Sequence, residues 1–366
     1  MTMRPRRKTM NNEIIASNEE AAVYETVTLA QSADIICSAS NILILTHVNP
    51  DGDCIGSAFA LKELIKAMGK QAYVVNPSEI PKRLRFLCGE QESCSLEGVD
   101  TAAFDLIMSI DTASPIQLGD HASLIPEIGL MIDHHGMGEP YAKNYIDPAA
   151  SASGEIVYEL YLEFRKSGKI SSCPEALRRM YAAIVSDTGS FKFSNTTPKT
   201  HIAASEMVRE INSADDGGMD TADVCRSLFG QRTLKELTAQ MIAIQNLRFY
   251  ENGSLGAVIF TQQILADAGL TEEEIGNVVD TPRGVEGVLV GISLRQLATD
   301  HTQYKVSSRA NAEIDCSAVC ASFGGGGHVR AAGCTITADS PEEALDMMVK
   351  AFGEAVRAYK QEKGIE

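Results

Sequence analysis

The alternation of short apolar runs with amphipathic segments is the feature of this sequence that most restricts its fold. Uninterrupted apolar runs of strand length occur in NILILTH, QAYVV, FDLIMSID and GLMIDHH. Among and after them, apolar residues recur at helical spacing in GSAFALKELIKAMGK, SGEIVYELYLEF and PEALRRMYAAIVSD. Strands that are apolar throughout are typical of sheets that are buried on both faces. The pattern therefore predicts an α/β domain with a parallel sheet and helices on both of its faces.

The second part of the chain starts a new set of elements. A polar, glycine-rich stretch over residues 211–223 indicates a boundary or hinge rather than packed structure. The apolar residues of 234–247 then predict a connecting helix, and SLGAVIFT, GVLVGISL and YKVSSRA predict further strands before a last helix that begins at SPEEAL. We expect a disordered tail over 1–20, a first domain over 21–212, a hinge and connector helix over 213–250, and a smaller α/β domain over 251–366.

Composition limits the class of protein. The 366 residues carry 32 Lys and Arg against 49 Asp and Glu, a net charge of −17, which argues against steering of long nucleic acids to the surface. The nine cysteines form no CxxC pair, so we expect reduced thiols and a cytoplasmic protein. No apolar segment approaches the roughly 20 residues that cross a membrane, so no membrane association is expected.

Acidic and histidine side chains recur where the predicted elements end. His47, Asp111 and the run 133–135 (Asp-His-His) follow three of the apolar runs, and Asp187 ends a predicted helix. An Asp after a strand commonly caps a helix or forms a turn, so each position alone is weak evidence for function. In an open parallel sheet, however, ligands bind at the carboxyl ends of the strands, and four such ends favour one shared site.

Carboxylates and imidazoles together indicate a site for divalent metal ions. This donor set suits Mn²⁺, Mg²⁺ or Fe²⁺ better than ions that prefer sulfur. Two cations about 3.5–4 Å apart share a carboxylate and activate water, which the slow hydrolysis of phosphate esters needs. The sequence contains neither HExxH nor a P-loop, so a zinc protease or a P-loop NTPase is not indicated.

Five motifs in order resemble the DHH phosphoesterase superfamily. HVNPDGDCIGS, SIDTA, IDHHG and VSDTGSF are similar to its four catalytic motifs, and SFGGGGHVRAAG is similar to the glycine-rich motif of the DHH-associated C-terminal domain. VSSRA, with Arg309, resembles a strand of that same domain. The resemblance covers nearly the whole chain. It implies an active site in the cleft between the two domains.

The resemblance also implies a role for each residue of the first domain's motifs. One cation would be held by His47, Asp51 and Asp111, and the other by Asp53, Asp111, His134 and Asp187, so that Asp111 bridges the pair. Asp133 would orient a histidine, and His135 would face the substrate phosphate. Gly52 would allow a tight turn that aims Asp51 and Asp53 at different cations. Cys54 would face away from the ligands and serve packing.

The glycine-rich motif suggests where a phosphate is bound. Successive glycines let backbone N–H groups approach an anion, although a glycine run can also be a flexible surface turn. In the family this loop belongs to the substrate-holding domain. The residues that we expect to bind substrate are Gly324, Gly325, Gly326, Gly327, His328, Arg330 and Arg309.

Among the branches of the superfamily, the compact two-domain form resembles this chain best. The basic SRKK-type motif of family II pyrophosphatases is absent, and there is no room for the added module of RecJ-type exonucleases. We therefore expect a Mn²⁺-dependent nano-RNase that also converts pAp to AMP. A phosphodiesterase for linear or cyclic dinucleotides remains the alternative, with a single-strand exonuclease, a pyrophosphatase or a non-catalytic nucleotide-binding protein behind it. The sequence leaves monomer and homodimer open.

Overall fold

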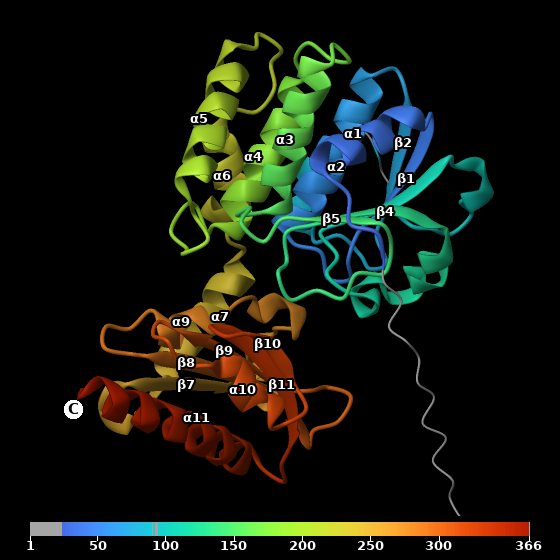
Figure 1. Cartoon of the computed structure of the whole chain (residues 1–366). Coiled ribbons are helices and arrows are strands. Elements are labelled where there is room, and N and C mark those ends of the chain that lie inside the picture. Colours follow the sequence, from blue (N-terminus) through green and yellow to red (C-terminus); the bar gives the residue numbers. More distant parts are fainter. Residues whose placement is uncertain (1–23, 90, 92–93, 366) are drawn as a thin grey trace, which may run out of the picture. The chain divides into compact units, whose positions relative to one another are not determined.

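The computed structural model describes residues 24–89, 91 and 94–365, so the predicted tail over 1–20 lies outside the described residues. The chain divides into two compact units, one ending at Gln231 and the other beginning at Arg232. Each unit has its own sheet and its own core (Figure 1).

The first unit is built on a five-stranded sheet in the order β2-β1-β3-β4-β5. All neighbouring strands are parallel, as the continuous apolar runs predict. The strands are β1 (Asn41–Leu45), β2 (Gln71–Val75), β3 (Leu106–Ile110), β4 (Ile128–Asp133) and β5 (Asn144–Ile146).

Both faces of this sheet are covered, but by different kinds of structure. Alternate strand residues such as Ile42 and Ile44 pack against α-helices, whereas Leu43 and Leu45 pack on the opposite face. That opposite face is covered largely by 3₁₀ turns, Pro115–Glu127, broken at Gly119. The helices of the unit are α1 (Leu29–Ser38), α2 (Gly52–Ala67), α3 (Ser153–Lys166), α4 (Pro174–Asp187), α5 (Pro198–Ser213) and α6 (Thr221–Cys225).

The polar stretch 211–223 is largely exposed, but it is fixed to the first unit by an arginine. The guanidinium of Arg178, on α4, donates to both carboxylate oxygens of Asp216 at 2.5 and 2.9 Å. Its Nε also donates to the carbonyl oxygen of Met219 at 2.7 Å. A nearly buried arginine thus fixes this segment, and its polar residues supply the partners that the arginine needs.

The second unit contains a mixed sheet in the order β10-β11-β9-β8-β7-β6. Only β7 and β8 run parallel; the other neighbours are antiparallel. Its strands are β6 (Arg248–Tyr250), β7 (Leu255–Phe260), β8 (Val290–Gln296), β9 (Gln303–Ala310), β10 (Gly326–His328) and β11 (Ala331–Thr337). Its helices are α7 (Leu234–Gln245), α8 (Gln262–Ala268), α9 (Asp280–Arg283), α10 (Cys316–Ala321) and α11 (Pro341–Lys363).

Helices cover both faces of the second sheet. Buried residues of α10 and α11 form one core with the strands, and α7 and α8 form a smaller core on the other side. On α7 the small residues Ala239 and Ala243 are buried, while Leu234, Leu237, Met241 and Ile244 are exposed. No helix in the described part of the chain is long and apolar enough to span a membrane.

Candidate metal centre

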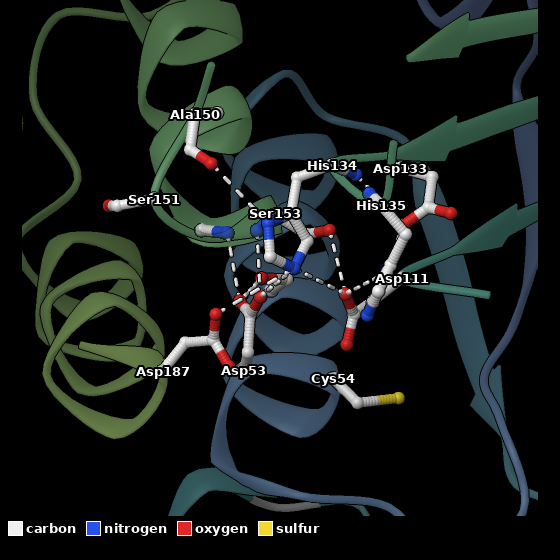
Figure 2. A network of polar contacts seen from close by, with 12 residues as sticks. Asp53, Cys54, Asp111, Asp133, His134, His135, Ala150, Ser151, Ser153 and Asp187 are labelled. Atoms are coloured by element: carbon white, nitrogen blue, oxygen red, sulfur yellow. Dashed lines mark hydrogen bonds and ion pairs between the residues drawn. The ribbon is translucent and has the colours of Figure 1, made fainter. Parts of the chain in front are cut away.

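The predicted ligands gather at one end of the parallel sheet, where β1, β3 and β4 finish. His47 lies two residues after β1, Asp111 directly follows β3, and His134 directly follows β4. Asp53 comes from the first turn of α2 and Asp187 from the last turn of α4. Figure 2 shows the carboxylates of Asp53, Asp111 and Asp187 pointing toward the ring of His134.

Both histidines present Nε2 to the carboxylates. The Nδ1 atom of His47 lies 2.8 Å from the carbonyl oxygen of Val48, and that of His134 lies 3.4 Å from the carbonyl oxygen of Ala150. Because a carbonyl only accepts, Nδ1 carries the proton in the neutral form of each ring, and in that form Nε2 has a lone pair for a cation. His47 Nε2 lies 3.5 Å from an oxygen of Asp111.

His134 lies at the centre of three carboxylates. Its Nε2 is 3.7 Å from Asp53, 3.6 Å from Asp111 and 3.8 Å from Asp187. Two ligands of a cation with bonds of about 2.1 Å lie about 3 Å apart when adjacent and about 4 Å apart when opposite. The observed separations therefore leave room for a cation between these donors.

Asp53 is held in place by the start of α3. One of its oxygens accepts from the backbone N–H of Ser153 at 2.7 Å. The other accepts from the N–H of Gly154 at 2.9 Å and from the hydroxyl of Ser57 at 2.7 Å. These donors satisfy N–H groups that a helix start leaves unpaired, and they fix the orientation of an almost completely buried carboxylate.

Asp111 has a strained backbone. Its φ is +56°, a left-handed conformation that residues other than glycine seldom adopt. Its side chain accepts from the hydroxyl of Ser153 at 2.9 Å, and its own N–H donates to the carbonyl oxygen of Ile132 on β4 at 2.9 Å. Strain of this kind persists where the surroundings fix it and is concentrated at functional sites.

Asp133 and His135 form a second layer beside the ligands. One oxygen of Asp133 accepts from Nδ1 of His135 at 2.8 Å and from the backbone N–H of His134 at 2.8 Å. His135 Nδ1 also lies 3.8 Å from Asp111, and the side chain is 25% exposed. Asp133 thus orients a histidine that reaches both the cluster and solvent.

Repulsion among the carboxylates shows in their ionisation. Burial raises the pKa of Asp53, and the nearby charges of Asp111 and Asp187 raise it further. Burial also raises the pKa of Asp187 to about 6. For Asp111, burial acts in the same direction, but the imidazoles around it outweigh burial and hold its pKa below the ordinary value.

The pKa values of His135 and His47 are raised, because their neighbours favour the charged imidazole more than burial disfavours it. Burial lowers the pKa of His135, but its hydrogen bond to Asp133 outweighs this effect and raises the pKa to about 9. Burial also lowers the pKa of His47, yet Cys54 and Asp111 together raise it to about 12. Without cations, the cluster therefore binds protons, which offset its buried negative charge. Divalent ions would neutralise the same charge.

Three sets of candidate ligands meet within the described residues. Each set has donor atoms within 4.8 Å of one another, and Asp111 and His134 each belong to two of them. The sets are His47 with Cys54 and Asp111, Asp111 with His134 and His135, and Asp53 with His134 and Asp187. The shared residues fit a site for two cations, which His47, Asp53, Asp111, His134 and Asp187 would hold.

The comparisons with known proteins agree with this geometry. The model of the DHH family, N-terminal domain, matches residues 41–184, and that of the DHHA1 domain matches residues 256–358. The chain is 31% identical to the bifunctional oligoribonuclease and PAP phosphatase NrnA of Thermus thermophilus, over 86% of this chain and 89% of that protein. The chain belongs to the DHH family.

Two further relatives extend the comparison. The cyclic-di-AMP phosphodiesterase GdpP of Bacillus subtilis is 27% identical over 88% of this chain, which matches 49% of that protein. An exopolyphosphatase-related protein from Bacteroides fragilis has a similar crystal structure, with a TM-score of 0.79 at 22% identity. That similarity covers 91% of this chain and 96% of the other, and it shows that the two proteins share a fold.

Three details of the DHH motif concern its first turn. Asp51 Oδ1 caps α2 by accepting from the N–H groups of Asp53 and Cys54, both at 3.0 Å, which leaves the other carboxylate oxygen for the ligand role that stays a prediction. Gly52 has an ordinary helical backbone, and it is required because a Cβ there would lie 2.4 Å from the hydroxyl oxygen of Ser186. The expectation that Cys54 faces away is wrong, since its sulfur joins the set with His47 and Asp111.

Several residues that support the ligands had no clear signal in the sequence. Asn195 donates to the Asp187 carboxylate at 3.3 Å and to the Ser151 carbonyl oxygen at 2.9 Å. Ser153 and Gly154 contact residues about 100 positions away along the chain. Only Ser57, which lies within the first motif, could have been found from sequence.

In the DHHA1 domain, the glycine-rich motif forms a hairpin. β10 pairs with β11, so that His328, Ala331 and Arg309 lie in one lateral row across three strands. Residues in such a row share a face of the sheet. A Cβ at Gly327 would lie 2.6 Å from the Ala331 carbonyl oxygen, so this glycine is needed for close strand pairing.

The remaining residues of this motif differ in their environment. Gly324 has a φ of +74°, and a Cβ at Gly325 would lie 2.2 Å from the carbonyl oxygen of Gly333, whereas Gly326 has open space around it. His328 and Arg330 are exposed. The side chains of the motif that could contact a phosphate from solvent are therefore those at the end of the hairpin.

Proposed function

We propose that this DHH protein hydrolyses very short oligoribonucleotides to nucleoside 5′-monophosphates and converts pAp to AMP. The observation that carries the proposal is the chain of three donor sets, of which two share Asp111 and two share His134. Similarity to NrnA over most of both chains supports the same substrates. The negative net charge of −17 favours substrates with few phosphates.

Two bound divalent cations would supply Lewis acidity to the phosphoryl oxygens and lower the pKa of a water molecule. The protein's own contribution is to fix the donors, since Asp53 and Asp111 are held by backbone or hydroxyl donors from the start of α3. His135 carries a proton on Nδ1 toward Asp133. Its second proton, on Nε2, is available to a leaving oxygen because the pKa is raised to about 9.

We assign substrate binding to the hairpin of the DHHA1 domain. Arg309, which is half-buried, and His328 share a row on one face, and Arg330 adds an exposed guanidinium. These groups would hold a terminal phosphate through charge-assisted hydrogen bonds, together with the backbone of Gly324–Gly327.

We propose Mn²⁺ as the activating ion, with Mg²⁺ or Fe²⁺ as alternatives, because carboxylate and imidazole donors suit these ions. All nine cysteines are free thiols, which supports a reducing cytoplasm as the compartment. Removing metal with a chelator is expected to abolish hydrolysis, and adding Mn²⁺ back is expected to restore it.

The test is a substrate panel. RNAs of two to five nucleotides, a 24-mer, pAp, pyrophosphate and cyclic dinucleotides are incubated with Mn²⁺, and initial rates are compared. We expect the short RNAs and pAp to turn over fastest. Equal or faster turnover of the 24-mer would contradict the short-substrate proposal, and preferential release of phosphate from pyrophosphate would indicate a pyrophosphatase.

Hydrolysis of cyclic or linear dinucleotides is the second candidate, favoured by the similarity to GdpP over 88% of this chain. The same panel separates the two functions. Asp111→Asn should lower kcat/KM at least about 10³-fold for whichever substrate is preferred, since it removes the carboxylate shared by two donor sets. Exposed Asp120→Asn is the control, and a fully active Asp111→Asn protein would contradict catalysis at this centre.

A further inference from the structure

The donor set at the end of β1 contains a sulfur atom. His47, Cys54 and Asp111 each offer a ligand atom, and these atoms all lie within 4.8 Å of one another. Cys54 belongs to the first turn of α2, one residue after Asp53, and is completely buried. In Figure 2 its side chain lies below the Asp111 carboxylate.

The other two members of this set are already oriented as ligands. His47 donates from Nδ1 to the Val48 carbonyl oxygen, so Nε2 is directed toward Asp111 at 3.5 Å. Asp51, the acidic residue next in the motif, uses one oxygen to cap α2 and is exposed. The sulfur of Cys54 thus lies in one set of donor atoms with His47 and Asp111, and the second oxygen of Asp51 is not used by the cap.

We infer that Cys54 is a ligand of the cation held by His47 and Asp111. The inference rests on the proposed two-cation function and refines it. On binding, the thiol releases its proton to solvent and a sulfur–metal bond forms. The resulting position has nitrogen, oxygen and sulfur donors, whereas the set of Asp53, His134 and Asp187 has only nitrogen and oxygen.

The two positions therefore differ in metal preference. A thiolate favours softer ions, so the position with Cys54 binds Co²⁺, Zn²⁺ or Fe²⁺ more tightly relative to Mn²⁺ and Mg²⁺. The position with Asp53 keeps the preference for harder ions that carboxylates confer. A mixed-metal centre follows when both kinds of ion are present.

The experiment is a titration of the metal-free full chain with Co²⁺ under argon. A thiolate ligand produces a sulfur-to-cobalt charge-transfer band in the near ultraviolet, and calorimetry gives the affinity and the number of ions bound. Wild type is compared with Cys54→Ser and Cys54→Ala. Cys88→Ala, which changes a buried thiol outside the donor sets, is the control.

We expect the band in wild type and Cys88→Ala and its loss in both Cys54 variants. Co²⁺ affinity at one position should fall at least about tenfold in those variants, as for other changes at metal sites. Circular dichroism identifies any variant that fails to fold. If one Cys54 variant does not fold, the presence or absence of the band in the other Cys54 variant tests the inference. Two Co²⁺ ions bound by wild type without the band, or a band that persists without Cys54, would overturn the inference and leave the two-cation function intact. Failure to bind Co²⁺ or Mn²⁺ at all would instead overturn the proposed function.

Discussion

Asn195 shows how a residue outside the motifs supports a metal ligand. Its side-chain amide donates to the carboxylate of Asp187 and also to the backbone carbonyl oxygens of Asp187 and Ser151. It therefore connects the end of α4 to the loop before α3. Partners of this kind set the orientation of a ligand and commonly affect metal affinity about 10–100-fold.

We predict that Asn195→Ala weakens Mn²⁺ binding by about 10–100-fold, because Asp187 loses its amide donor. The Mn²⁺ concentration that gives half-maximal hydrolysis of pAp should rise accordingly, while the rate at saturating Mn²⁺ should recover. Asn246→Ala, directly after α7 in the other unit, serves as the control. An unchanged Mn²⁺ requirement would show that Asp187 is positioned without Asn195.

His135 gives the metal-free protein a pH-dependent stability. Its folded-state pKa of about 9 exceeds the ordinary value of 6.5 because Asp133 and Asp111 favour the charged imidazole. A raised histidine pKa stabilises the folded state fully below pH 6.5, and this contribution is lost as the pH rises to 9.

In the presence of a chelator, we expect the free energy of unfolding of wild type to fall by about 1–3 kcal/mol more than that of His135→Gln between pH 6.5 and 9. Urea titrations at both pH values measure the difference. His301→Gln, an exposed change in the second unit, is the control. If the free energy of unfolding changed equally with pH in wild type and His135→Gln, the pKa of His135 would not be raised in the folded state.

At the level of elements, α3 and α4 approach closely at Gly154. A Cβ added there would lie 2.4 Å from Cβ of Ala183 and 3.1 Å from the carbonyl oxygen of Met180. The close approach brings the start of α3 near Asp53, whose carboxylate accepts from the Gly154 N–H. Packing between two helices thus positions a ligand on a third.

Gly154→Ala should destabilise the protein by about 1–3 kcal/mol, since overpacking forces the helices apart. Ala183→Gly makes room at the same contact, so the double variant should recover part of the loss, and urea unfolding of all four proteins gives the coupling. Gly326→Ala, with open space around it, should change stability little. Additive effects of Gly154→Ala and Ala183→Gly would contradict the contact.

The same element-scale packing explains which features could be predicted from the sequence. The parallel sheet and most ligand positions follow from apolar runs that end in Asp or His, because parallel strands bring their carboxyl ends to one edge. The capping role of Asp51 is local and agrees with the general preference for Asp before a helix. The position of Cys54 could not be predicted, because it depends on how α2 lies relative to β1 and β3. The hydrogen bond from the Ser153 hydroxyl to Asp111 also depends on packing between segments that are distant in the sequence.

On the scale of the whole molecule, charge opposes long polyanions. A net charge of −17 repels each phosphate of an RNA, so the repulsion grows with RNA length, whereas local cations such as Arg309 and Arg330 act on a few phosphates only. Salt screens the long-range repulsion because the Debye length falls from about 30 Å at 0.01 M to about 10 Å at 0.1 M.

We therefore predict that the ratio of kcat/KM for a 24-mer to that for a trinucleotide rises several-fold between about 0.01 M and about 0.1 M ionic strength. A protein with a basic nucleic-acid groove would show the opposite change in this ratio. Its affinity for a long RNA falls as salt is added, because the release of counterions on binding becomes less favourable. Initial rates at fixed free Mn²⁺ measure the ratio, and a 24-mer that keeps natural phosphodiesters only at its two ends, with an uncharged backbone between them, should show no such rise. A ratio that falls with salt would contradict the prediction. It would indicate that a basic surface on this protein attracts long RNA despite the negative net charge.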